Sequence, residues 1–241
     1  MQTFTLDLGA GERVAGDHLP GLLRGSGLSG SAPGYLFLHG LGSVRAGEKS
    51  ASLMSHAAAN GRACTRFDFR GHGDSSGTIG QVTIGELIAD TVLVLQRYGP
   101  AVIVGSSLGG LVGAFATARR PDLVRGLAML APALGFLEHI DQHVDAQGRM
   151  WTSEGFSFPL SPRVATDARQ LDERSLPAML RVPTLIVHGT ADEVVPPGDS
   201  ERFFAAIPHA QKSLWIVPGG NHRLNTVAAA IWPRLDALLA E

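Results

Sequence analysis

Short runs of apolar residues recur along the chain and alternate with longer segments whose apolar residues stand three or four positions apart. Runs of the first kind are typical of buried strands, and segments of the second kind are typical of amphipathic helices. The predicted strands are residues 35–39, 63–69, 101–104, 127–130, 184–187 and 213–217. The predicted helices are residues 47–60, 84–98, 108–119, 199–206 and 226–239. This alternation predicts an α/β fold with a mainly parallel sheet covered by helices on both faces.

Two segments depart from the alternation. The polar section before Tyr35 has weak strand character and ends in the Gly- and Ser-rich stretch 25–34, which predicts an opening β-hairpin followed by a surface loop. Residues 133–181 mix aromatic and polar side chains, and we predict that they form a short lid. We expect its apolar residues to pack on the sheet or to line an acyl or aryl pocket. The sequence therefore predicts one domain over residues 1–241, with a lid insertion at about 133–181.

Composition narrows the possible partners. A chain of 241 residues, 44% of them hydrophobic, can bury one sizeable core. Its formal charge of −2 provides no basic field for nucleic acid, and no apolar run approaches the roughly 20 residues of a membrane span. The single cysteine, Cys64, cannot form an intrachain disulfide, and the first residues lack a signal-peptide pattern. We expect a cytoplasmic protein; monomer and homodimer are equally compatible with this composition.

A candidate nucleophile lies where a predicted strand runs into a predicted helix. Residues 102–110 read VIVGSSLGG, which contains G-x-S-x-G centred on Ser107. A serine at such a strand-to-helix turn is raised above the sheet, and glycines on both sides relieve the crowding of the turn. Ser106 lacks glycines at the corresponding positions. The pattern therefore identifies Ser107 as the nucleophile.

A serine nucleophile needs a general base and an acidic residue that orients the base. On α/β sheets with this turn, the chain order is serine, acid, histidine. Asp192 follows the predicted strand 184–187, and His222 follows the predicted strand 213–217. Because the carboxyl ends of parallel strands share one edge of a sheet, we predict a Ser107–His222–Asp192 triad. Asp68 and Asp74 precede the nucleophile and do not fit this order.

The triad chemistry also needs two backbone N–H groups to stabilise an oxyanion. One is expected from Leu108, the residue after the nucleophile. The other is expected from Leu41, in the HGLGS loop after the first predicted parallel strand.

The remaining reactive side chains have simpler interpretations. We expect His39 and His72 to shape their loops, His188 to pack at a strand end, and Cys64 to be an inert core thiol. No pair of histidines has metal-ligand spacing with a nearby carboxylate, so we predict neither a metal nor a cofactor.

With these residues in place, the chain resembles the α/β-hydrolase superfamily from about Tyr35 to its end. Residues 39–50 (HGLGSVRAGEKS) and 61–77 (GRACTRFDFRGHGDSSG) are similar to bacterial cinnamoyl and feruloyl esterases, and equally to the acyl-protein thioesterase and acyl-glucuronide esterase group. Residues 104–110 (VGSSLGG) and 220–224 (GNHRL) favour the second group. The chain differs from the animal members in having His39-Gly40 at the oxyanion loop, and we expect no transit peptide.

The resemblance implies an α/β-hydrolase fold and the hydrolysis of carboxylic esters or thioesters of small to medium acyl groups. Ser107, Asp192 and His222 take the nucleophile, acid and base roles. A C–C bond hydrolase or a perhydrolase could use the same triad. A non-catalytic ligand-sensing or scaffolding pseudo-hydrolase is disfavoured, because such proteins usually lose a triad member and none is missing here.

Overall fold

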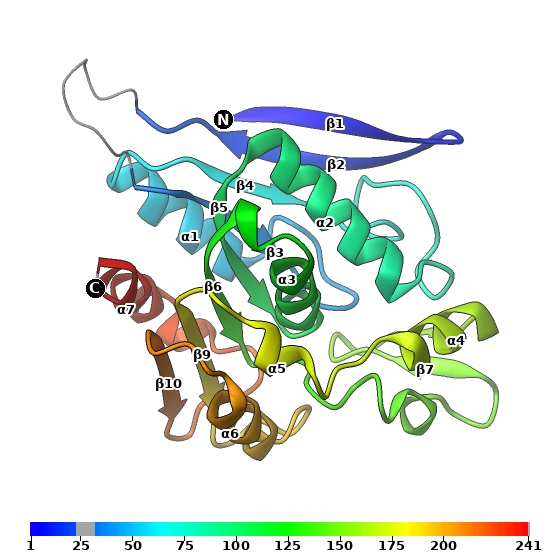
Figure 1. Cartoon of the computed structure of the whole chain (residues 1–241). Helices are drawn as coiled ribbons and strands as arrows, with labels where there is room; N and C mark the ends of the chain where they lie inside the picture. Colours follow the sequence, from blue (N-terminus) through cyan, green and yellow to red (C-terminus); the bar gives the residue numbers. More distant parts are fainter. Residues whose placement is uncertain (23–31, 241) are drawn as a thin grey trace.

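An eight-stranded sheet in the order β1-β2-β4-β3-β5-β6-β9-β10 forms the centre of the molecule (Figure 1). The computed structural model describes residues 1–22 and 32–240. β1 and β2 form an antiparallel hairpin, β2 is also antiparallel to β4, and the remaining neighbours are parallel. The strands are β1 Gln2–Gly9, β2 Glu12–Leu19, β3 Gly34–Leu38, β4 Cys64–Phe67, β5 Ala101–Ser106, β6 Val124–Leu130, β9 Thr184–Gly189 and β10 Lys212–Val217.

Helices cover both faces of the sheet, as the alternating pattern predicts. In Figure 1, α1 and α7 lie to the left of the sheet, and α2 and α3 lie to the right. The side chains of β5 alternate between the two cores: Val102 and Val104 pack with α1 and α7, whereas Ile103 packs with α2 and α3. The helices of the two layers are α1 Glu48–Ala59, α2 Ile84–Tyr98, α3 Leu108–Arg119, α6 Pro197–Ala206 and α7 Ala228–Ala240.

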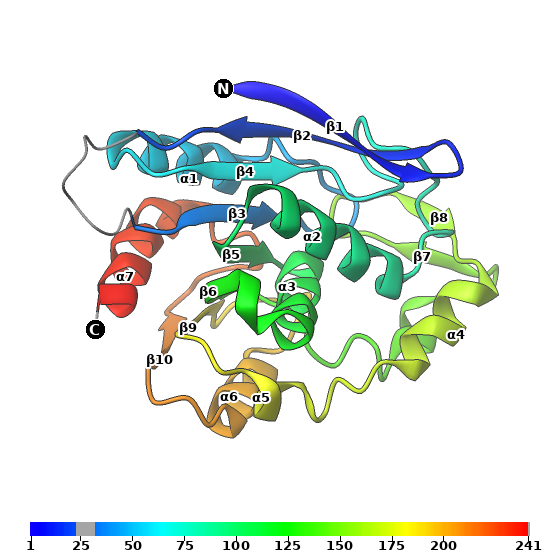
Figure 2. The same cartoon turned by 45° about the horizontal axis from the view of Figure 1, so that its top comes forward.

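The sequence explains where α2 begins. The Thr83 hydroxyl accepts the N–H of Glu86 at 3.2 Å, and the Glu86 carboxylate accepts the N–H of Thr83 at 2.8 Å. This reciprocal capping box satisfies two N–H groups that have no partner within the helix. Figure 2 shows α2 and α3 side by side on the sheet, where the turn that begins α3 also ends β5.

The chain between β6 and β9, residues 131–183, is called the insertion below. It contains the short elements η2 Ile140–His143, β7 Arg149–Trp151, β8 Ser157–Pro159, α4 Pro162–Gln170 and α5 Leu176–Met179. β7 and β8 pair as a separate two-stranded sheet. The insertion is joined to α2 and the loop before it: Ser161 N–H donates to Gly80 O at 2.8 Å, and Gly85 N–H donates to the Asp167 carboxylate at 2.9 Å.

The predicted elements occur with shifted boundaries. β6 begins three residues before its predicted start, and the last predicted helix divides into a 3-10 turn, η3 Asn225–Val227, followed by α7. The opening hairpin is confirmed, whereas residues 25–31 of the predicted loop lie outside the described residues. In residues 1–22 and 32–240, no helix is long and apolar enough to cross a bilayer.

Candidate active site

Ser107 occupies a strained turn between β5 and α3. Its φ of 53° lies in the left-handed region, which is unusual for a residue with a side chain. The two neighbouring glycines leave no room for larger residues. A Cβ on Gly105 would lie 2.2 Å from Gly109 O, and a Cβ on Gly109 would lie 2.3 Å from Leu38 O. The G-x-S-x-G pattern is therefore a steric requirement of this turn.

The structure brings together the three residues of the predicted triad. His222 Nε2 lies 3.1 Å from Ser107 Oγ, and His222 Nδ1 lies 2.8 Å from Asp192 Oδ2. A carboxylate only accepts, so Nδ1 carries the proton and Nε2 is left to accept the hydroxyl proton of the serine. The arrangement can therefore deprotonate Ser107 as it attacks an electrophilic carbon.

The loops that carry Asp192 and His222 hold one another in place. Ala191 N–H donates to Gly220 O at 2.9 Å, and Gly219 N–H donates to the Thr190 hydroxyl at 2.8 Å. These bonds link the ends of β9 and β10, so the acid and the base keep a fixed separation.

The Asp192 side chain is fully buried, and its oxygens are occupied by donors. Oδ1 accepts the N–H groups of Val194 at 2.8 Å and Val195 at 2.9 Å. Burial acts to raise the pKa of Asp192, but His188, His222 and the Val195 N–H together lower it well below its usual range. The carboxylate therefore stays ionised at neutral pH and can stabilise a positive charge on His222.

His188 has a closer relation to the site than the sequence indicated. It is buried at the end of β9, as predicted, but its Nε2 also lies 3.0 Å from Asp192 Oδ2. Nε2 donates to Val195 O at 3.0 Å, and Nδ1 lies 2.7 Å from the Ser200 hydroxyl, which can donate to it. The short H-G-x-x-D spacing places His188 near the end of β9, just before the loop that carries Asp192, but spacing alone does not determine how that loop folds back.

The loop that contains Leu41, one of the two expected oxyanion donors, is shaped by two histidines. His39 donates from Nδ1 to Gly40 O at 2.8 Å and accepts the Phe69 N–H at 3.0 Å. His72 accepts the Gly42 N–H at 3.1 Å. Burial, with His72 close by, lowers the pKa of His39 to about 3, so its ring remains neutral. The predicted loop-shaping roles of both histidines are confirmed.

Leu41 and Leu108 both line a cavity that opens at Ser107. Leu108 is the first residue of α3, where the N–H has no partner within the helix. In the described part of the chain, no residue accepts a hydrogen bond from either N–H. Both groups are therefore free to donate to a developing oxyanion, although their assignment remains a prediction.

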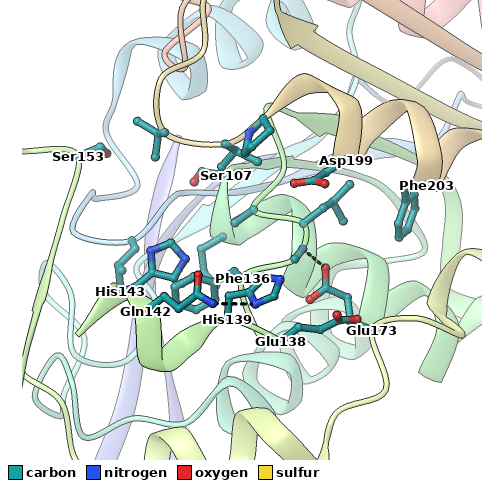
Figure 3. A pocket seen from close by; sticks show the side chains of 18 of the residues that line it. Ser107, Phe136, Glu138, His139, Gln142, His143, Ser153, Glu173, Asp199 and Phe203 are labelled. Atoms are coloured by element: carbon teal, nitrogen blue, oxygen red, sulfur yellow. Dashed lines mark hydrogen bonds between the residues drawn. The ribbon is translucent and has the colours of Figure 1, made fainter. Parts of the chain in front are cut away.

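Two hollows meet at Ser107. The larger, with a volume of about 660 Å³, is called the insertion pocket and is bounded by the insertion and α6. The smaller, of about 240 Å³, is called the α1 pocket and includes His222 and the first turn of α1. Figure 3 shows that the insertion pocket is lined by Phe136 and Phe203 and by polar groups such as Gln142 and Glu173.

The insertion supplies both core and pocket residues. Phe136 and Trp151 line the insertion pocket, whereas Leu137 and Phe158 are buried in the core beside α2 and α3. Both expectations for the aromatic and aliphatic residues of this segment therefore apply, to different residues. Within residues 1–22 and 32–240, no three His, Cys, Asp or Glu side chains cluster in a way that could hold a metal ion.

Comparisons with known proteins agree with the fold. A family model described as "alpha/beta hydrolase fold" matches residues 36–179, and a model described as "Serine aminopeptidase, S33" matches residues 157–226. The chain is 28% identical over 217 residues to the mitochondrial palmitoyl-protein thioesterase ABHD10 of Mus musculus, covering 83% of this chain and 72% of that protein.

Solved structures show the same fold. The mouse alpha/beta hydrolase domain-containing protein 10 superposes with a TM-score of 0.79 at 23% identity, covering 99% of this chain and 100% of the other. Est1E from Butyrivibrio proteoclasticus, solved with bound ferulic acid, superposes with a TM-score of 0.79 at 19% identity, covering 97% and 99%. The resemblance drawn from the motifs to the α/β-hydrolase superfamily and its thioesterase group is confirmed, and Est1E shares the fold.

Proposed function

The chain belongs to the α/β-hydrolase fold family, and from this premise we propose that it cleaves carboxylic esters or thioesters through an acyl-enzyme on Ser107. The observation that carries the proposal is the continuous contact from Ser107 Oγ to His222 and on to the buried Asp192 carboxylate. The thioesterase and esterase relatives support the same class of activity, carboxylic ester hydrolysis.

Each residue has one task in the proposed reaction. His222 Nε2 accepts the Ser107 proton as Oγ attacks the acyl carbon, and the Leu41 and Leu108 N–H groups stabilise the oxyanion. His222 then returns the proton to the leaving oxygen or sulfur. Water gives a proton to His222 and attacks the acyl-enzyme, which releases the carboxylic acid and restores the Ser107 hydroxyl. Asp192 holds the imidazole in the required tautomer throughout.

Initial rates on p-nitrophenyl esters from acetate to palmitate test the proposal, with Ser107→Ala as the blank. We expect Ser107-dependent turnover and a loss on the order of 10⁶-fold in kcat for the variant. The optimum should lie at small to medium acyl groups. A tenth of wild-type turnover remaining in Ser107→Ala would contradict the assigned nucleophile.

The same assay separates the alternatives. A C–C bond hydrolase would show Ser107-dependent cleavage of a β-diketone and little ester turnover. A perhydrolase would produce peracid from an ester and hydrogen peroxide. A folded protein that turns over none of these would support the non-catalytic reading.

We further propose a cytoplasmic location. The one cysteine, Cys64, is buried as an unpaired thiol on β4, and burial raises its pKa to about 12, which suits an inert core residue in a reducing compartment. The mouse relative is named as a mitochondrial protein, so fractionation of the native host decides this point.

A further inference from the structure

If the proposed function holds, the position of His222 indicates which pocket holds the acyl group of the substrate and which holds the leaving group. The leaving group receives its proton from His222, so it must lie on the side where the imidazole is exposed. His222 lines the α1 pocket and is absent from the lining of the insertion pocket. The acyl group therefore lies in the insertion pocket, beneath the insertion and α6.

A buried carboxylate faces this acyl side. Glu173 lines the insertion pocket and is only 7% exposed. Its carboxylate accepts the N–H groups of Gly135 at 2.5 Å and Leu137 at 3.4 Å, one on each oxygen. Each carboxylate oxygen can accept more than one hydrogen bond, so acceptor capacity remains unused. Figure 3 shows Glu173 on the pocket wall, set apart from Ser107, with the bond to Gly135 dashed.

The other charges of the pocket are already matched. Glu138 pairs with Arg174 at 2.6 Å, and Asp199 pairs with Arg202. The remaining titratable groups, His139 and His143, are imidazoles, and burial lowers the pKa of His143. Among the described residues, no Lys, Arg or His nitrogen lies within 4.0 Å of the Glu173 carboxylate. When Glu173 is ionised, the pocket therefore contains one negative charge in excess.

An unmatched, buried carboxylate is unfavourable unless it meets a cation or a strong donor. Burial raises the pKa of Glu173 to about 7, with Glu138 and Asp199 adding to the rise. The pocket therefore gains its excess negative charge in the neutral pH range, where a bound cation would remove the penalty.

We propose that the insertion pocket binds an acyl group that carries a protonated amine, with Glu173 as the counter-ion that selects it. A primary ammonium supplies three donors, which can reach the free lone pairs of the carboxylate. The amine keeps its proton up to about pH 10, so the interaction strengthens as Glu173 ionises. Glu173 acts on specificity and takes no part in the proton transfers of the triad.

The test compares isosteric p-nitrophenyl esters that differ only in charge. One pair is 6-aminohexanoate and heptanoate, and the other is 8-aminooctanoate and nonanoate, each corrected with the Ser107→Ala blank. We expect kcat/KM to favour at least one amino ester over its alkyl partner by about 10-fold at pH 8, as a charge-assisted hydrogen bond allows. The preference should fall at pH 6, where Glu173 is protonated.

Two variants distinguish the effect of the Glu173 charge from the effect of the other charges in the pocket. Glu173→Gln keeps an acceptor for the Gly135 N–H but removes the charge, and we expect the preference to reverse in favour of the alkyl esters. Glu138→Gln removes a carboxylate that is already paired, and at least half of the preference should remain.

The possible results distinguish the two proposals. Ser107-dependent turnover of alkyl esters with no preference for either amino ester at pH 8 overturns the role of Glu173 and leaves the esterase proposal intact. Absence of Ser107-dependent turnover on every ester removes the proposed function itself. If Glu173→Gln does not fold, the pH dependence of the wild-type preference decides, and a preference unchanged between pH 6 and pH 8 counts against Glu173.

Discussion

Replacing Glu173 with glutamine should make the folded protein more stable at alkaline pH and change its pH dependence. The carboxyl group has a pKa of 4.5 when exposed and about 7 in the fold, because burial penalises the charged form. A group whose pKa is raised by folding favours the folded state fully below pH 4.5, and this contribution is lost as the pH rises through 7. Glutamine has no such titration.

The size of the effect follows from the two pKa values. Each tenfold change in proton affinity is worth about 1.4 kcal/mol, so complete ionisation of Glu173 should cost about 3 kcal/mol of unfolding free energy. About 2 kcal/mol of that should be lost between pH 5 and pH 8. For a chain of this length, the loss corresponds to roughly 4–8 °C in Tm.

Urea unfolding at pH 5, 6, 7 and 8 measures the difference between variant and wild type, which cancels the other titrating groups. The unfolding free energy of Glu173→Gln minus that of wild type should rise by about 2 kcal/mol across this range. Glu201→Gln, on the exposed face of α6, is the matched control and should give a flat difference. A flat difference for Glu173→Gln as well would refute the claim that this carboxylate is buried without a counter-ion.

Three further substitutions test the triad, the start of α2 and the turn at Ser107. Asp192→Asn should leave the fold intact and lower kcat roughly 10⁴-fold, measured on the best p-nitrophenyl ester. Thr83→Ala removes half of the capping box of α2 and should lower the unfolding free energy by about 1 kcal/mol with little change in kcat/KM. Gly109→Ala places a Cβ 2.3 Å from Leu38 O, so α3 must move away from β3, and kcat should fall by about 100-fold or more through displacement of the Leu108 N–H. A fully active Gly109→Ala enzyme would show that the turn tolerates this movement.

The sequence was most informative where the structural requirement is local. The turn at Ser107 needs glycines two residues away on either side, and the loops of Asp192 and His222 follow strands with continuous apolar runs. These features can be recognised without knowing any long-range contact. The triad geometry could therefore be anticipated residue by residue.

The insertion was less predictable for physical reasons. β7 and β8 have three residues each, too few for an alternating pattern to stand out. Glutamate is a residue type usually found at the surface, so the sequence gives no sign that Glu173 is buried. Its backbone partners, Gly135 and Leu137, lie 38 and 36 positions earlier in the chain. Likewise, the approach of His188 to Asp192 depends on how the loop after β9 folds back, which no local pattern encodes.

The triad residues and many of the residues that line the insertion pocket lie in different parts of the chain, which has a practical consequence for protein engineering. Ser107, Asp192 and His222 lie outside residues 131–183, whereas Phe136, Glu173 and many of the other groups that contour the insertion pocket lie within them. The codons for chemistry and many of the codons for acyl selection are thus physically separate on the gene. A mutagenic library confined to the pocket-facing codons of residues 131–183 would sample new substrate ranges while every clone keeps the same catalytic apparatus.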